Sequence, residues 1–272
     1  MNLRDVQGVN DRDGGTTYWL LTEYNAGVRY HNAGVYSAEP GKGFAWHTHP
    51  EETEEEEQMY IVRGTGKLVY KKNRTDYEIE FKKGQAIYSG HLTHRLENTG
   101  NEPLLIFFMI APLPLTTIVY GGLRDRGLGF VDYAHLDPPV VGVPENTPIF
   151  HFGNLENRKL IDADKAGMKH MDGIEGVIEK VGLGSMWHTH TIESGQEDIF
   201  YICNGKGSYV YIKQGKIHVI PFREGDAIFS KHLTNYTWNS GQEDIEMATA
   251  IAPRGSKVIR HSGDMSTLYT HR

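Results

Sequence analysis

The chain has 272 residues, 39% of them hydrophobic, with a formal net charge of −7 and a single cysteine. One cysteine excludes an intramolecular disulfide framework, and the acidic balance argues against a nucleic-acid partner, which normally selects a basic patch. The N-terminal residues are charged throughout, so no secretory signal is expected. The longest apolar run, residues 104–115, is too short to span a bilayer. These features predict a soluble, cytoplasmic protein with no membrane partner.

Short segments rich in Val, Ile, Tyr and Phe follow one another through the first half of the chain. Turn residues (Gly, Asn and charged side chains) separate them at a spacing of roughly 8–12 residues, which is typical of a β-sandwich or β-barrel. The pattern therefore predicts an all-β fold. The clearest of these segments lie at residues 58–64, 67–72, 77–81, 85–90 and 104–111.

The rest of the chain contains little helical periodicity. Residues 113–148 are rich in proline and glycine and predict a linker between two domains. Residues 157–171 are the only fair candidate for a helix, and a short one. Residues 254–272 predict a polar tail.

The second half of the chain repeats the first at a constant offset of 141 residues. When residues 41–112 are laid on residues 182–253, 30 of the 72 positions are identical, far more than chance would give. Solenoid repeats are about 20–50 residues long, so a repeat of this length favours duplication of a whole folding unit. We therefore predict two similar domains, at residues 1–112 and 149–253.

Each copy carries a pair of histidines separated by one residue. In an extended strand such residues point to the same face, so His47 and His49 present two imidazoles to one point, as do His188 and His190. A divalent ion could bind there if neighbouring strands supply further ligands. A lone pair of this kind would suggest surface histidines, but its recurrence in both copies favours a metal site.

An acidic residue lies seven positions before an equivalent glycine in each copy. These acids are Glu57, before Gly64, and Asp198, before Gly205. The remaining glutamates of the run EETEEEE, residues 51–57, are expected to project into water.

Each copy resembles the cupin barrel, whose motifs read G-x5-H-x-H-x3,4-E-x6-G and, roughly, G-x5-P-x-G-x2-H-x3-N. The resemblance covers about two thirds of the chain. It implies a bicupin, which is two double-stranded β-helix (jelly-roll) barrels in one chain, and a divalent transition metal. Fe(II) or Mn(II) is favoured, with Ni, Cu or Zn possible. In the first copy the matching residues are Gly41, His47, His49, Glu57, Gly64, Gly84, His94 and Asn98.

Two departures from the family pattern bear on the choice of carboxylate ligand. The second motif lacks P-x-G, and the gap after the histidine pair is seven residues instead of three or four. Glu54 would satisfy the shorter gap, and Glu56 is identical to its equivalent, Glu197. We favour Glu57 because its distance to Gly64 belongs to the strand that carries the ligand, whereas a hairpin tolerates changes of length.

The resemblance implies metal sites of unequal quality in the two copies. The first would use three histidines and a carboxylate and is the predicted catalytic centre. The second would have an asparagine in place of the last histidine, and an amide oxygen is a weaker donor than an imidazole. The first set is His47, His49, Glu57 and His94, and the second is His188, His190, Asp198 and Asn235.

Several neighbouring residues have weaker assignments. His91 and His232 are interpreted as making structural turn hydrogen bonds, with contact to a metal ligand or substitute ligation as alternatives. Trp46 and Trp187 should face away from the metal and pack in the core. Four residues share the parity of the ligands and should line the cavities: Ala45, Met59, Met186 and Phe200.

The family implied by resemblance includes several enzyme classes, so the fold does not choose among them. We expect a metal-dependent oxidoreductase of dioxygenase type, acting on a small substrate that chelates through two oxygens, such as a diketone, enediol or keto acid. One alternative is a non-redox isomerase or lyase of keto or sugar substrates; the sequence does not identify its base, for which Tyr60 and Tyr88 are candidates. Another is a non-catalytic protein that binds a metal or small molecule. A homo-oligomer is possible.

Overall fold

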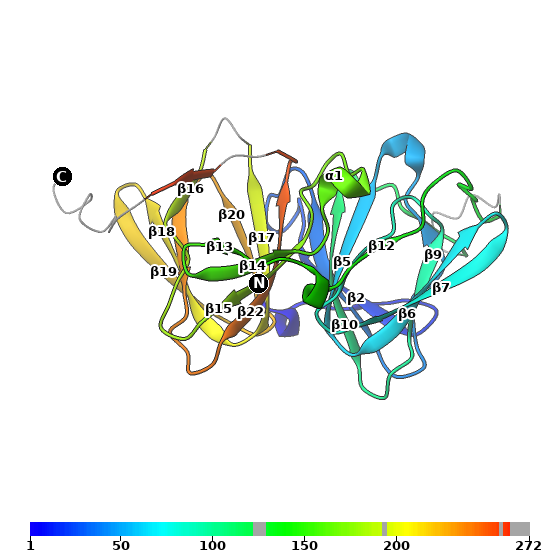
Figure 1. Cartoon of the computed structure of the whole chain (residues 1–272), viewed down its shortest axis with the longest axis horizontal. Coiled ribbons are helices and arrows are strands. Elements are labelled where there is room, and N and C mark those ends of the chain that lie inside the picture. The colour runs from blue at the N-terminus through cyan, green and yellow to red at the C-terminus, as the bar shows by residue number, and fades with distance from the viewer. Residues whose placement is uncertain (122–128, 192–194, 256–257, 262–272) are drawn as a thin grey trace.

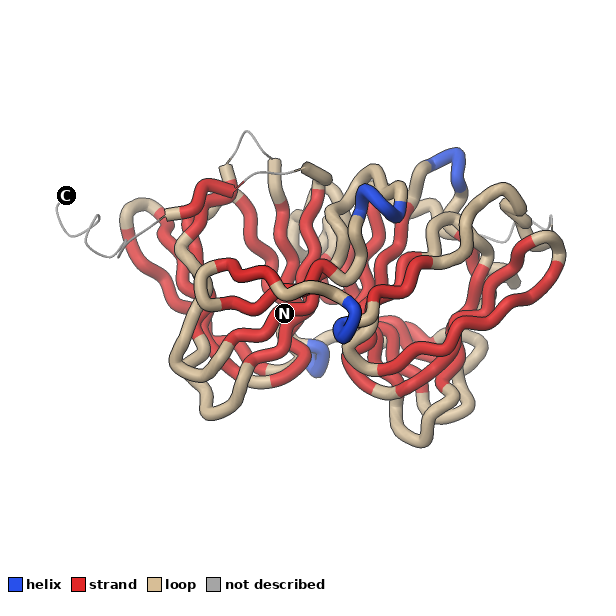
Figure 2. Tube along the Cα trace, in the orientation of Figure 1, coloured by secondary structure: helices blue, strands red, loops and turns tan. Residues whose placement is uncertain are grey.

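Two β-barrels lie side by side in the computed structural model, which describes residues 1–121, 129–191, 195–255 and 258–261 (Figure 1). Strands make up most of the described chain (Figure 2). The prediction of an all-β fold with two jelly-roll barrels is confirmed. No helix in the described ranges is both long and apolar enough to cross a membrane.

The first barrel consists of a seven-stranded and a five-stranded sheet. In spatial order the larger sheet contains β1 (Val9–Asn10), β2 (Gly15–Leu21), β3 (Asn32–Ala38), β10 (Leu104–Ala111), β5 (Glu56–Arg63), β8 (Ala86–Tyr88) and β12 (Val140–Gly142). The smaller sheet contains β11 (Ile118–Val119), β4 (His47–Thr48), β9 (His94–Asn98), β6 (Thr65–Lys72) and β7 (Thr75–Lys82).

The second barrel repeats this topology with a six-stranded and a five-stranded sheet. Its larger sheet contains β13 (Phe150–Phe152), β14 (Leu155–Lys159), β15 (Glu175–Glu179), β22 (Ile245–Ala252), β17 (Glu197–Asn204) and β20 (Ala227–Lys231). The smaller one contains β19 (Lys216–Arg223), β18 (Lys206–Lys213), β21 (Thr234–Trp238), β16 (His188–His190) and β23 (Val258–Arg260). The helical turns are η1 (Leu3–Asp5), η2 (Glu51–Thr53), η3 (Pro144–Asn146) and α1 (Ala163–Ala166).

The helix expected over residues 157–171 does not form as predicted. β14 takes the beginning of that stretch because it pairs along its whole length with β15, and this pairing outweighs the local helical pattern. Only the single turn α1 follows. Asp162 caps its N-terminus, and Gly167, in the left-handed conformation at φ 71°, ends it.

Segments outside the predicted domains take part in the barrels. Within the predicted linker 113–148, β11 pairs with β4 and β12 pairs with β8, so this segment supplies two strands to the first barrel. Within the predicted tail 254–272, β23 pairs with β16. β11 and β23 are related by the same offset of 141, so the duplication extends beyond residues 112 and 253. Residues 122–128, 256–257 and 262–272 lie outside the described residues.

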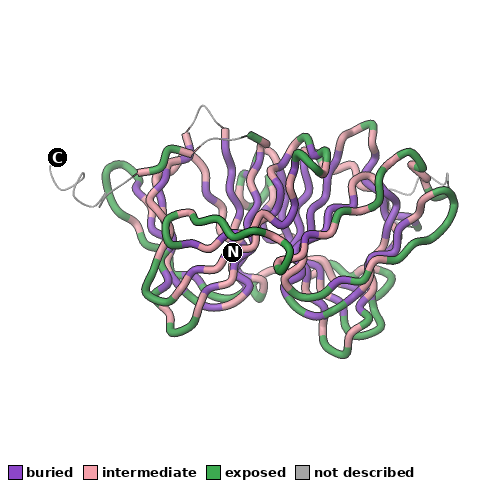
Figure 3. Tube along the Cα trace, in the orientation of Figure 1, coloured by how far each residue is buried: buried purple, intermediate pink, exposed green. Residues whose placement is uncertain are grey.

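The barrels share one apolar core where their larger sheets meet (Figure 3). β5 is buried on both faces, because one face lines its own barrel and the other packs against the second barrel. Tyr60 on this outer face belongs to the shared core, as does its equivalent Tyr201. Met59, on the inner face of β5, belongs to the interior core of the first barrel.

A reciprocal pair of glutamates also joins the barrels. The carboxylate of Glu56 accepts hydrogen bonds from the backbone amides of residues 169–170 in the second barrel. The equivalent Glu197 accepts hydrogen bonds from the amides of residues 29–30 in the first barrel. The identity of this glutamate in both copies therefore has a structural explanation: each barrel holds one loop of the other.

Candidate metal centres

The first cluster lies inside the first barrel, where β4, β5 and β9 meet. The carboxylate of Glu57 lies at its centre. Its Oε2 is 3.3 Å from Nε2 of both His49 and His94, and 3.6 Å from Nε2 of His47. One donor atom from each of these four residues lies within 4.8 Å of the others, and all four residues are buried. The structure therefore brings together the four residues predicted for the first site.

Hydrogen bonds to Nδ1 fix the orientation of these imidazoles. Nδ1 of His47 donates to the carbonyl oxygen of Ala45, and Nδ1 of His94 donates to that of Leu92. A carbonyl oxygen can only accept, so each proton is on Nδ1 and the lone pair of Nε2 faces the cluster. Nε2 of His47 is buried and has no hydrogen-bond partner among the described residues. An inward-facing lone pair of this kind fits a metal ligand.

Glu55 orients the third imidazole and was missed by the sequence reasoning. It is buried, so the expectation that it would project into water is wrong. Its Oε1 accepts a hydrogen bond from Nδ1 of His49 at 2.8 Å. The backbone amides and hydroxyls of Thr116 and Thr117 donate to the same carboxylate. The sequence signal was available, because Glu55 shares strand parity with Glu57 and therefore its face.

The other two candidate carboxylate ligands, Glu54 and Glu56, face the second barrel. Glu54 forms ion pairs with Lys169 at 2.5 Å and with His170 at 3.4 Å, and Glu56 binds the backbone there. Glu56 too is buried, contrary to the expectation of a solvated run. Of the three candidate ligands, only Glu57 points into the barrel.

The charges of the first cluster favour a bound cation. Burial raises the pKa of Glu55 and Glu57, but their hydrogen bonds outweigh it, lowering that of Glu55 to about 2 and that of Glu57 well below its ordinary value. Burial lowers the pKa of His49, yet the two carboxylates raise it to about 9. Burial lowers the pKa of His94 to about 4. Two carboxylates thus face one protonated imidazole, and a divalent ion would balance this excess of negative charge.

The second cluster occupies the equivalent place in the second barrel. Donor atoms of His188, His190 and Asp198 lie within 4.8 Å of one another, and all three residues are buried. Nε2 of His190 is 3.0 Å from Oδ2 of Asp198. Nδ1 of His188 donates to the carbonyl oxygen of Met186, two residues earlier, as in the first cluster. The predicted two-histidine, one-carboxylate set therefore comes together.

Asn235 keeps part of the geometry of the histidine that it replaces. Its Nδ2 donates to the carbonyl oxygen of Leu233, as Nδ1 of His94 does to Leu92. Its Oδ1 is buried and has no hydrogen-bond partner among the described residues. An amide oxygen left free in this way fits a fourth, weaker metal ligand.

The support around the second cluster is weaker than in the first. Gln196 stands at the position of Glu55, and its Nε2 donates to Oδ1 of Asp198 at 2.7 Å. A neutral amide cannot supply the negative charge that Glu55 gives to His49. Burial is therefore the main influence on the pKa values of the second cluster. It raises the pKa of Asp198 to about 7 and lowers the pKa of His188 and of His190 to about 4.

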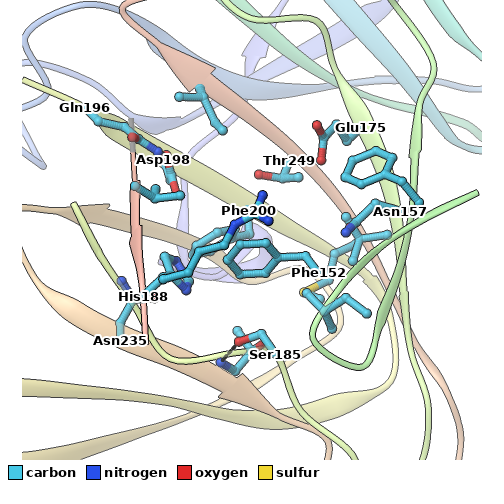
Figure 4. A pocket seen from close by; sticks show the side chains of 18 residues that line it. Phe152, Asn157, Glu175, Ser185, His188, Gln196, Asp198, Phe200, Asn235 and Thr249 are labelled. Carbon is cyan, nitrogen blue, oxygen red and sulfur yellow. Dashed lines mark hydrogen bonds between the residues drawn. The ribbon is translucent and has the colours of Figure 1, made fainter. Parts of the chain in front are cut away.

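The cavities beside the two clusters differ in depth. The first barrel has a cavity of about 260 Å³ that touches a single member of its cluster, His47; Ala45 also lines it. The second barrel has a cavity of about 190 Å³ lined by His188, Asp198 and Asn235, with Phe200 on its wall (Figure 4). Ala45 and Phe200 are therefore cavity residues, as expected.

Two tyrosines named as candidate bases do not face the clusters. Tyr60 and Tyr88 both lie in the apolar core shared by the barrels, and burial raises the pKa of each. Tyr60 lies three positions after Glu57, an odd step along the strand, so it points to the opposite face of β5. Neither tyrosine is placed to exchange a proton at the metal clusters.

The two tryptophans next to the ligands, and His91, make contacts that suit structural roles. Trp46 and Trp187 are only half-buried, so the expectation that they pack in the core is wrong. Nζ of Lys71 lies 4.4 Å from the ring centre of Trp46, a cation–π contact on the outside of the barrel. Nδ1 of His91 lies 3.1 Å from the carbonyl oxygen of His49, which suits the interpretation of a structural turn hydrogen bond.

Comparisons with known proteins agree with this architecture. Residues 34–110 match the Cupin domain family. The tetracenomycin polyketide synthase protein TcmJ of Streptomyces glaucescens is 31% identical over 102 residues, which is 38% of this chain and 64% of that protein. The match thus spans less than two thirds of that relative's length.

Solved structures with a similar fold include two oxalate decarboxylases. The Lactobacillus farciminis oxalate decarboxylase, in a formate complex, has a TM-score of 0.75 and 11% identity, covering 100% of this chain and 92% of that one. The Bacillus subtilis oxalate decarboxylase at pH 4.6 has a TM-score of 0.70 and 13% identity, covering 100% and 81%. At these identities the likeness shows the fold alone. With two barrels of cupin topology, the chain has the fold of a bicupin.

Proposed function

We propose that this bicupin is a metal-dependent enzyme acting on a small substrate that offers two oxygen atoms. One observation carries the proposal: Nε2 of three buried imidazoles converges on the carboxylate of Glu57. The proposed ligands of the first site are His47, His49, Glu57 and His94. Those of the second site are His188, His190, Asp198 and Asn235.

Four protein ligands leave coordination positions free for small molecules. A divalent ion in such a site can polarise a carbonyl, stabilise an enolate or bring dioxygen beside a chelating substrate. The protein's part is to hold the imidazoles in one orientation, through Ala45, Leu92 and Glu55, and to keep bulk water away from the buried ligands.

The reaction that we favour is an oxidation of dioxygenase type with Fe(II) or Mn(II). Three imidazoles and one carboxylate are ligands that these ions accept, and the first cluster is rich enough in negative charge to hold one. The substrates that suit this chemistry are diketones, enediols and keto acids. We further propose that the protein works in the cytoplasm and that homo-oligomers form by pairing of barrels.

A lyase or isomerase that does not consume dioxygen is the second candidate. Two observations favour it. Two solved structures of similar fold are oxalate decarboxylases. The second cavity also holds the carboxyl group of Glu175, whose pKa burial raises to about 7, as suits a proton donor or acceptor.

Metal analysis followed by assays with and without oxygen tests both candidates. The chain is purified, its metal is measured by elemental analysis, and it is reconstituted anaerobically with Fe(II) or with Mn(II). Turnover of a panel of diketones, enediols and keto acids is then followed by an oxygen electrode and by mass spectrometry. Oxygen uptake that matches substrate loss supports the dioxygenase, and equal turnover under nitrogen supports the lyase or isomerase. A chain that takes up no metal contradicts the proposed function.

A further inference from the structure

The cavities of the two barrels occupy equivalent positions but reach different depths. His47 and His188 correspond under the offset of 141. Several other pairs that line the two cavities also correspond, such as Val119 and Arg260. The first cavity touches only His47 of its cluster, whereas the second is lined by Asp198 and Asn235 as well as His188. Something in the first barrel must therefore fill the deeper part.

Stacked aromatic rings fill the first barrel at that depth. The ring of Tyr36 lies 3.9 Å from that of Phe108 and 4.6 Å from that of Phe44, measured between centroids, and Trp19 meets Phe108 edge-on at 5.1 Å. The hydroxyl of Tyr36 donates to Oε1 of Glu57 at 2.9 Å. The aromatic plug, as we name Trp19, Tyr36, Phe44 and Phe108, thus packs on the cluster itself.

The second barrel has small residues where the plug has rings. The equivalents of Tyr36, Phe44 and Phe108 are Val177, Ser185 and Thr249, and all three line the second cavity. Three aromatic side chains are therefore replaced by side chains of three heavy atoms or fewer beyond Cα, and the second cavity extends into the space that the rings occupy in the first barrel.

A glycine supports the plug in one barrel, and a carboxyl group replaces it in the other. A Cβ at Gly34 would lie 2.6 Å from the ring of Phe108 and 2.5 Å from the carbonyl oxygen of Tyr18, so no side chain fits while the plug is present. The equivalent of Gly34 is Glu175, which pairs with Thr249 across β15 and β22 and lines the cavity. The second barrel thus has a carboxyl group at the position where the first barrel needs a glycine to make room for the ring of Phe108.

We propose that the second barrel holds the substrate chamber and that the first barrel is a plugged barrel whose metal serves the fold. The proposal rests on the proposed function and moves its reaction from the first cluster to the second. The ligand class that fits is a small aromatic or otherwise largely apolar compound with two adjacent oxygens. Its body would lie against Phe152 and Phe200, its oxygens would face His188 and Asp198, and a hydroxyl would reach Glu175.

The distribution of polar groups supports this ligand class. The chamber wall is mostly apolar, so a highly polar sugar would leave its hydroxyl groups without partners. Figure 4 shows polar side chains on both sides of the chamber, with His188 and Asp198 on one and Glu175 on the other, which favours a molecule with oxygens at both ends. On the chamber wall, the guanidinium of the exposed Arg260 lies 5.0 Å from the ring of Phe152.

Substituting larger side chains into the second cavity tests whether it is the substrate chamber. The full chain is loaded with Mn(II), and 4-nitrocatechol, a coloured aromatic compound with two adjacent oxygens, is titrated while its absorbance is followed. Thr249→Phe places in the second barrel the residue that plugs the first, and we expect it to weaken probe binding at least tenfold. The matched variant Thr17→Phe fills the first cavity and should leave binding within twofold. Glu175→Gln should weaken it about threefold to tenfold.

Controls separate failure of the chamber from failure of the enzyme. Metal content is measured for every variant and should be unchanged. Val177→Phe repeats the test at a second lining position if Thr249→Phe does not fold, as judged by its thermal transition. A metal-loaded chain that does not bind the probe, binds it equally well after Thr249→Phe or Val177→Phe, or loses it only after Thr17→Phe contradicts the chamber. Absence of metal contradicts the proposed function instead.

Discussion

The two barrels share strand order, register and the position of their clusters, yet their interiors differ in opposite ways. The first has the richer donor set, a charged support at Glu55 and rings packed onto Glu57. The second replaces one histidine with Asn235 and the supporting carboxylate with Gln196, but its cavity reaches more of its cluster than the first cavity does. The barrel that is better equipped to hold an ion is thus the less equipped to admit a substrate.

Duplication explains how one chain can combine these properties. A single barrel must reconcile dense packing around its ligands with room for a substrate. Two copies can divide the tasks, since the shared core and the reciprocal glutamates Glu56 and Glu197 hold the copies as one body. The shared strand order is kept while interior residues beside the clusters differ, so substitutions at those positions can break the comparison or sharpen it.

The largest effect is expected from removing the central carboxylate of each cluster. Glu57→Gln replaces a charge that three imidazoles face by a neutral amide, and we expect the metal affinity of the first site to fall at least about a hundredfold. Asp198→Asn should affect only the second site. Competition with a fluorescent chelator, with elemental analysis of the dialysed protein, measures both. Full metal content at unchanged affinity in Glu57→Gln would show that this cluster does not bind the ion.

The next effect concerns the residue that orients the ligand. Glu55→Gln gives the first barrel the amide found at Gln196, and we expect a loss of about tenfold to a hundredfold in metal affinity, because the Nδ1 proton of His49 loses its charged acceptor. The reverse change, Gln196→Glu, should tighten the second site. The matched control is Glu52→Gln, an exposed position in the same acidic run. Equal affinities in Glu55→Gln and Glu52→Gln would exclude the orienting role.

A smaller effect, on stability, is expected from the reciprocal glutamates. Glu56→Gln and Glu197→Gln each weaken hydrogen bonds from two backbone amides at the junction of the barrels, and a lost charge-assisted hydrogen bond costs about 1.5–3 kcal/mol. Urea unfolding should show a lower free energy of unfolding for both variants, and their similar size would demonstrate the symmetry of the junction. Glu78→Gln, at an exposed ion pair with Lys67, is the surface control and should change little. If the two glutamates do not stabilise the junction, all three variants should have the same free energy of unfolding.

The sequence predicted the fold and both clusters because they depend on local and periodic signals. Histidines two apart share a strand face, and the repeat supplies each motif twice, so the alternation of a strand sufficed to group His47 with His49 and to favour Glu57. The plug and the junction depend instead on contacts between distant segments. Nothing local to Gly34 reveals that the ring of Phe108 lies against it, and the burial of Glu56 follows only from the position of the second barrel.

The sequence reasoning also favoured the first copy as the catalytic centre because it judged the sites by their ligands. Room for a substrate is set by residues such as Tyr36 and Val177, which lie on strands far from the metal motif and whose side chains matter only through packing. A comparison of the two copies position by position along β3 and β15 would have found this difference. That comparison requires knowing which face of each strand lines the barrel.

The smallest effect, on the pH dependence of stability, tests whether the carboxyl group of Glu175 lies in the second cavity away from water. Burial raises its pKa to about 7, above the ordinary value of 4.5, so the folded chain holds the proton more tightly than the unfolded chain. The carboxyl group costs nothing below pH 4.5, where both states are protonated, and stability is lost as the pH rises through 7. Glu175→Gln cannot ionise, so in metal-free protein it should unfold at the same temperature as the parent at pH 4.5 and several degrees higher at pH 8, for a difference of about 1–3 kcal/mol. Differential scanning calorimetry at the two pH values measures this, with Glu78→Gln as the exposed control. An equal shift at both pH values would mean that the carboxyl group is solvated, and the chamber would then be open to water where the proposed ligand needs an apolar wall.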